Sequence, residues 1–113
     1  MDFSVSDEEV EGWAKAHGLA ELTHREDARL AIGCSRGDPA ALTSFDQQYT
    51  PIITVTARRF GDADFVSEVC QLVRQKLLVA QTGAGPAIKE YGGRGQLAKY
   101  VQAVAVRTAL NLL

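Results

Sequence analysis

The chain has 113 residues, of which 46% are hydrophobic and 23% are charged. This length allows one domain with a single core, and the composition is too apolar for a disordered chain. No apolar run approaches the roughly 18 residues of a membrane span, and the first residues lack the basic and apolar segments of a secretory signal. We therefore expect a cytoplasmic protein with no membrane span.

The net charge of −2 hides an uneven distribution. Residues 1–27 contain eight acidic and two basic side chains, whereas residues 28–113 contain six acidic and ten basic ones. An acidic lead ahead of a basic body is compatible with a nucleic-acid partner. We accordingly divide the chain into an acidic N-terminal arm, residues 1–27, and a domain, residues 28–113.

The first predicted helix lies in the arm. Ser6 is placed to cap it, and the helix is expected to run to about His17, with Gly18 as its stop. A second helix is predicted over about 25–36. The arm either folds over a basic surface through charge complementarity or serves as a solubilising extension or extra packing helix.

A third helix is predicted to begin at Asp38 and Pro39, because a capping side chain followed by proline is typical of a first turn. Apolar residues continue at helical spacing beyond this start. Pro51 falls inside the pattern and predicts a kink or a short break near residues 47–50.

A fourth helix is predicted from the cap Asp62 to about Ala80. Its inner face is apolar and its outer face is polar, as expected of an amphipathic helix. The outer face comprises Asp64, Ser67, Glu68, Gln71, Arg74, Gln75 and Leu78.

Residues 81–95 are rich in glycine and predict a loop, and a last helix is expected from Gln96 to the end. One side of that helix forms an apolar stripe, which includes Thr108 and Leu112. No alternating strand pattern occurs. The fold class is therefore predicted to be all-α, a compact bundle of about four to five helices.

The loop and the second face of the last helix carry cationic, aromatic and amide groups. Such groups contact phosphate, stack on bases and read base edges, respectively. The same composition is also found on an ordinary solvated helix face. The residues concerned are Lys89, Tyr91 and Arg94 in the loop, and Gln96, Lys99, Tyr100, Arg107 and Asn111 in the helix.

Neither catalysis nor metal binding is indicated. There are no paired carboxylates at active-site spacing and no set of serine, histidine and aspartate or of cysteine and histidine. His17 and His24 lack further metal-binding partners, and Cys34 and Cys70 lie in apolar segments that favour buried free thiols. We expect a protein that is not an enzyme and has no metal or cofactor.

Four segments, taken in order, resemble region 2 of sigma-70 family factors of the extracytoplasmic function group. The resemblance covers about 80 of the 113 residues. The segments are Gly37–Phe45 (GDPAALTSF), Asp64–Val69 (DFVSEV), Tyr91–Gly95 (YGGRG) and Ala103–Asn111 (AVAVRTALN).

This resemblance implies an all-helical transcription initiation factor domain with two partners. The first is RNA polymerase core, whose β′ subunit clamp helices would dock on the fourth helix. The implied polymerase-binding residues are Asp64, Ser67, Glu68, Gln71, Arg74 and Gln75. An anti-sigma factor is a further possible partner.

The second implied partner is promoter DNA, namely the non-template strand of the minus-ten element. In the family, a base is flipped into a pocket between the loop and the last helix, which traps melted DNA. The resemblance makes Tyr91 and Tyr100 the aromatic contacts and makes Lys99 and Arg94 phosphate contacts. The base contacts would be Arg107 and Asn111.

The chain departs from the family pattern at several of these places. The family usually has arginine at the position of Gly92 and an acid at that of Arg94, and it often has tryptophan at Tyr100 and asparagine at Arg107. These changes bear on which base the pocket prefers. The C-terminal domain that reads the minus-35 element is absent, so we expect the chain to be a piece of a longer protein.

A different class of function fits the same amphipathic helices. A helical protein–protein interaction module would use the same outer faces without binding DNA. Substitution of Tyr91, Arg94 and Arg107 discriminates between the two hypotheses, because only DNA binding requires these side chains.

Overall fold

The structure is a computed structural model that describes residues 5–18, 24–79, 86–91 and 95–113. Within these ranges the chain is helical and contains no strand, which confirms the all-α prediction. The elements are α1 (Asp7–Ala16), α2 (Arg25–Ser35), α3 (Pro39–Ala57), α4 (Ala63–Leu78), the 3-10 turn η1 (Ala87–Glu90) and α5 (Leu97–Leu112).

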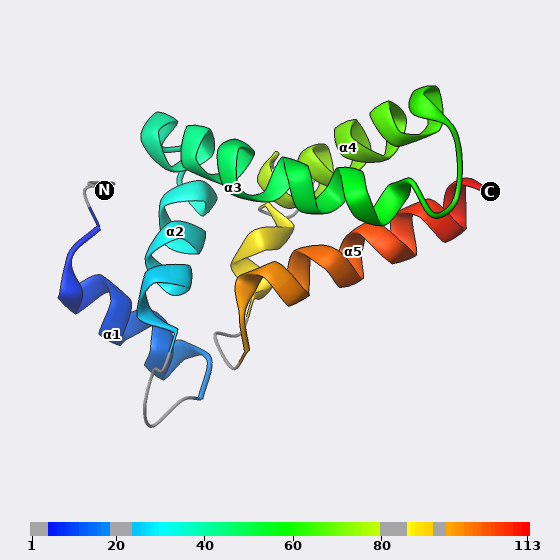
Figure 1. Ribbon diagram of the computed structural model, residues 1–113. Helices are drawn as coiled ribbons and strands as arrows, with labels where there is room; N and C mark the ends of the chain where they lie inside the picture. Colours follow the sequence, from blue (N-terminus) through cyan, green and yellow to red (C-terminus); the bar gives the residue numbers. More distant parts are fainter. Residues whose placement is uncertain (1–4, 19–23, 80–85, 92–94) are drawn as a thin grey trace.

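The third helix, α3, is the centre of the bundle and packs against α2, α4 and α5 (Figure 1). Helices α4 and α5 also pack against each other, and η1 lies against α2 and α4. Helix α1 lies on the outside of α2, at the end of the molecule remote from the C-terminus.

Three helices begin at the caps predicted from sequence. The side chains of Ser6, Asp38 and Asp62 accept backbone N–H groups two or three residues later, at 3.2, 2.9 and 3.0 Å. Gly18 and Gly37 follow the first two helices with φ of 72° and 75°. Glycine adopts this left-handed conformation without steric cost, so it ends a helix readily.

Two local predictions are corrected. The predicted break near residues 47–50 is absent, since α3 continues through Pro51. Tyr49 and Ile53 are buried on either side of the proline and hold both turns against the core. Leu78, predicted on the outer face of α4, is only 7% exposed because the end of α4 packs against η1.

The predicted division after residue 27 falls inside α2, which begins at Arg25. In addition, Val5, Val10 and Ala14 are buried and belong to the same apolar core as the rest of the bundle. The arm therefore contains the predicted short helix, but it packs as part of the domain.

The core is formed by apolar side chains from the helices α1 to α5 and from η1. Full burial of each large one contributes roughly 1.5–3 kcal/mol relative to exposure. The largest that are fully buried are Phe45, Ile53, Leu77, Ile88, Leu97, Val10, Val69, Val73 and Val101. None of the described helices is long and apolar enough to cross a membrane.

Candidate nucleic-acid interface

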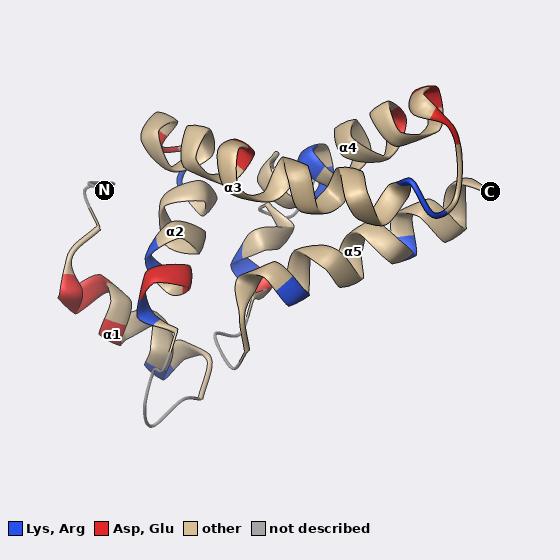
Figure 2. Ribbon diagram, viewed as in Figure 1, with Lys and Arg blue, Asp and Glu red and all other residues tan. Residues whose placement is uncertain are grey.

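The outward face of α5 is the basic surface predicted from sequence. Its buried stripe turns toward α3 and α4, whereas Lys99 and Arg107 are exposed. Basic positions are coloured blue along the ribbon of α5 (Figure 2). Both side chains line a shallow hollow of about 490 Å³. Gln102, which sequence analysis missed, lines the same hollow and adds an amide between the two cations.

Tyr91 is not a surface residue in this structure. Its side chain is only 3% exposed, and its hydroxyl donates a hydrogen bond to the carbonyl oxygen of Gly95. Burial raises the pKa of Tyr91 to about 12. Tyr91 is therefore not accessible as an aromatic contact in this conformation, because the ring packs into the core instead of facing solvent.

Tyr100 is half-buried and connects α5 to η1. Its hydroxyl donates to the carbonyl oxygen of Ala87 at 3.1 Å, and its ring centre lies 5.7 Å from that of Tyr91. Burial raises its pKa as well. Lys89 and Gln96 are exposed near this end of α5, and Arg94 lies outside the described residues.

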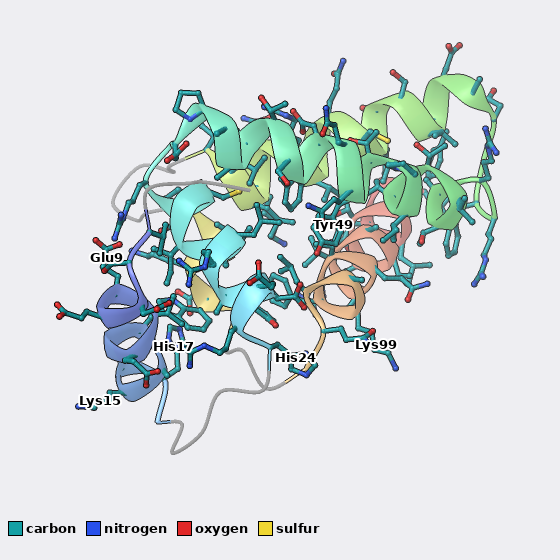
Figure 3. All side chains as sticks on the ribbon, turned by 60° about the vertical axis from the view of Figure 1, so that its left-hand side comes forward. Glu9, Lys15, His17, His24, Tyr49 and Lys99 are labelled. Carbon is teal, nitrogen blue, oxygen red and sulfur yellow. The ribbon has the colours of Figure 1, made fainter. Side chains whose placement is uncertain are left out.

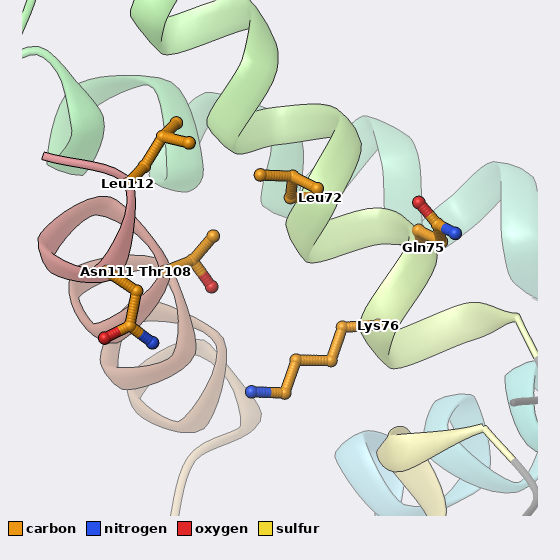
Figure 4. Close-up of a pocket in the computed structure, with 6 residues that line it drawn as sticks. All are labelled: Leu72, Gln75, Lys76, Thr108, Asn111 and Leu112. Atoms are coloured by element: carbon orange, nitrogen blue, oxygen red, sulfur yellow. The ribbon is translucent and has the colours of Figure 1, made fainter.

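Asn111 is exposed but lines a different hollow from Arg107. It lies in a groove of about 590 Å³ between α4 and α5, opposite Leu72, Gln75 and Lys76 (Figure 4). One predicted DNA-binding residue, Asn111, and one predicted polymerase-binding residue, Gln75, therefore line the same groove. The predicted apolar residues Thr108 and Leu112 line it too and are only half-buried.

The six residues predicted to bind polymerase are all exposed on α4. Arg74 has an internal partner, because its guanidinium binds both carboxylate oxygens of Asp46 on α3, at 2.9 and 3.2 Å. This bond with Asp46 raises the pKa of Arg74. Lys76, on the same helix, is exposed and points toward α5, and sequence analysis missed it (Figure 4).

The acidic side chains of α1 pair with arginines of α2 and not with the basic face of α5. Glu11 accepts from Arg25 at 2.8 Å, and Asp7 accepts from Arg29 at 2.6 Å. A third pair joins Glu9 to Arg36. The Arg25–Glu11 and Arg36–Glu9 pairs are exposed, so each contributes at most about 1 kcal/mol. Arg29 is only 21% exposed, and its guanidinium also donates a hydrogen bond to the Val5 carbonyl oxygen.

A second set of α1 contacts reaches the predicted promoter loop. The Trp13 ring centre lies 5.8 Å from that of Tyr91 and 4.1 Å from that of His17. The His17 Nδ1 is 2.9 Å from the carbonyl oxygen of Trp13, and its Nε2 is 3.1 Å from that of Lys89 in η1 (Figure 3). Trp13 and Lys89 are far apart in the sequence, so local spacing gives no sign of this contact.

Asp27 of α2 fixes the beginning of α5. Its carboxylate accepts the backbone N–H of Leu97 at 2.9 Å, whereas Gln96, the residue at the cap position of α5, provides no side-chain bond. Burial raises the pKa of the neighbouring Tyr49, and the negative charge of Asp27 adds to the effect. Asp27 therefore sets the position of the helix that carries Lys99 and Arg107.

Comparisons with known proteins returned nothing: no family model, no curated protein and no solved structure matches the chain. Among the described residues, no group of three or more histidine, cysteine, aspartate or glutamate side chains is placed to hold a metal ion. The described surface offers cations, amides and a half-buried ring, which are groups for non-covalent recognition of a polyanion with bases.

Proposed function

We propose that the chain is the promoter-reading domain of a sigma-70 family factor of the extracytoplasmic function group. In this role α4 binds the β′ clamp helices of RNA polymerase, and α5 with its preceding loop captures the non-template minus-ten strand. Support comes from the four resembling segments and their order. The observation that carries the proposal is the exposed face of α5, where Lys99 and Arg107 flank an amide in one hollow.

The spacing of these cations suits a single strand. Lys99 and Arg107 are eight residues apart, which corresponds to about 12 Å along a helix axis. They therefore reach different phosphates or a phosphate and a base, while Tyr100 provides part of a ring for stacking. Stacking and phosphate contacts offset the few kcal/mol that unstacking a base costs.

Binding to the isolated clamp-helix fragment of β′ tests the polymerase half of this proposal. The double variant Glu68→Ala with Gln71→Ala should weaken binding at least tenfold, because both side chains are exposed on α4. Gln47→Ala on α3, which is also exposed, is the matched control and should bind like the wild type. Absence of binding at low salt, with a helical circular dichroism spectrum, contradicts the sigma assignment.

Binding of single-stranded minus-ten oligonucleotides across a salt series tests the DNA half in the same experiment. Lys99→Ala should weaken binding and lower the slope of log affinity against log salt by about 0.7, as for one lost phosphate contact on a single strand. Gln47→Ala again serves as the control. An unchanged slope would remove Lys99 from the interface.

One observation favours the interaction module as a second candidate. The groove between α4 and α5 exposes Leu72 and Leu112 beside Lys76, a combination that suits an amphipathic protein segment (Figure 4). If the chain binds neither clamp helices nor DNA, this reading takes precedence.

A further inference from the structure

Tyr91 is covered by another part of the same chain. Its nearest aromatic neighbours are Tyr100, on α5, and Trp13, on α1. A base can stack on the Tyr91 ring only if one of these neighbours moves. Since α5 is packed against both α3 and α4, whereas α1 lies on the outside of α2, α1 is the element free to move.

The attachment of α1 is weak compared with that of the other helices. It packs chiefly against α2, burying Val10 and Ala14, with Val5 just before the helix and Trp13 partly buried. Its ion pair between Glu11 and Arg25 is exposed to solvent, whereas Arg29, which pairs with Asp7, is only 21% exposed. A helix of ten residues is also marginal on its own in water, so detachment and unfolding of α1 go together.

The contacts that hold α1 to the loop are specific. The Trp13 indole lies beside the Tyr91 ring, with the ring centres 5.8 Å apart and the planes tilted by 37°. The His17 ring bridges from the Trp13 carbonyl to the Lys89 carbonyl in η1. A neutral imidazole donates only one of these two bonds, whereas the imidazolium donates both. Trp13 of α1 and His17, which directly follows α1, thus both contact the segment Ala87–Tyr91.

We propose that α1 is a removable cover of the aromatic pocket, in which the Trp13 indole occupies Tyr91 in place of a nucleic-acid base. This inference rests on the proposed function and adds its regulation. Only molecules in which α1 is open then bind a single strand at this pocket, so the apparent affinity is the intrinsic affinity multiplied by the fraction of open molecules. A partner that takes α1 away, such as a protein that binds its acidic face, would increase promoter binding.

Two substitutions in α1 should change DNA affinity in opposite directions. Trp13→Ala removes the occupying ring and should tighten binding of a minus-ten oligonucleotide by about tenfold. Gly12→Ala adds a Cβ that meets no atom within 4 Å and favours the helix, so it should strengthen the cover and weaken binding by about fivefold. Lys15→Gln is the control, since Lys15 is exposed on α1 and points to solvent (Figure 3).

If Trp13→Ala fails to fold, His17→Ala tests the same proposal, because His17 is only partly buried. This variant should also tighten binding of the minus-ten oligonucleotide. Trp13 is the only tryptophan, so its emission reports closure without any DNA. In a urea titration it should change before the circular dichroism signal of the bundle.

If the emission and circular dichroism transitions coincide, or if the variants bind DNA as tightly as the wild type does, α1 is not a cover. The proposed function would still stand in that case. If neither the wild type nor the opened variants bind DNA, the cover and the DNA half of the proposed function fail together. Binding to the clamp helices then reports separately on the polymerase half.

Discussion

The two cysteines differ sharply in environment although both are free thiols. Cys34 is fully buried in α2, and burial raises the pKa of its thiol to about 12, with the nearby carboxylates of Asp46 and Asp38 adding to the effect. Cys70 in α4 is half-buried, with its sulfur 3.6 Å from the Thr54 hydroxyl.

Cys70 should therefore react with a thiol reagent at neutral pH at least about a hundredfold faster than Cys34, because the thiolate is the reactive form and Cys34 supplies almost none. Alkylation of the native protein followed by peptide mass spectrometry measures both rates. Equal rates would show that the core around Cys34 opens on the time scale of labelling.

The surroundings of some site residues could be predicted from the sequence, and those of others could not. The exposure of Lys99 and Arg107 follows from helical periodicity, which needs only local spacing. Tyr91 lies in a segment without periodicity, so its burial could not be read from spacing. Its cover, Trp13, is 78 positions away in the sequence, and a local pattern carries no information about such a partner.

At the scale of elements, α5 depends on α2 for its first turn. Asp27→Ala removes the acceptor of the Leu97 N–H and leaves this partly buried donor without its side-chain partner. The variant should lose about 1–3 kcal/mol of unfolding free energy, as for a lost cap with an unsatisfied polar group.

Urea unfolding followed by circular dichroism measures this loss. Asp27→Asn keeps a side-chain oxygen and should retain most of the stability. Glu26→Ala, at an exposed neighbouring position, is the control. A stability of Asp27→Ala equal to that of the control would mean that the cap contributes nothing.

Helix starts were predictable because a cap is a local device. Ser6, Asp38 and Asp62 each bond to a backbone group two or three residues away. The continuity of α3 was not predictable, because packing of Tyr49 and Ile53 outweighs the single hydrogen bond that Pro51 removes. The pairing of α1 acids with α2 arginines could not be predicted either, because a count of charged residues does not say which side chains lie close together in the fold.

At the scale of the molecule, folding raises the pKa of all three tyrosines. Burial raises the pKa of Tyr49 and Tyr100, and that of Tyr91 to about 12, whereas tyrosine in an unfolded chain titrates near pH 10. Because the folded values are raised, this contribution to stability is fully present below about pH 10. It is lost as pH rises from about 10 through 12.

Unfolding free energy should accordingly fall by on the order of 2 kcal/mol between about pH 8 and about pH 11. Urea titrations at the two pH values measure the fall, and Tyr91→Phe should make it smaller. Tyrosinate absorption that develops in the folded protein near pH 10 would contradict the burial of these rings.

The groove shared by Gln75 and Asn111 has a consequence for how the two proposed partners act together. Ligands seated on the two sides of one groove are neighbours, so the contact between them adds a coupling free energy. Coupling of this kind is reciprocal: whatever factor the polymerase contributes to DNA affinity, DNA returns to polymerase affinity. A complex of all three components would then persist under dilution where either pair alone separates.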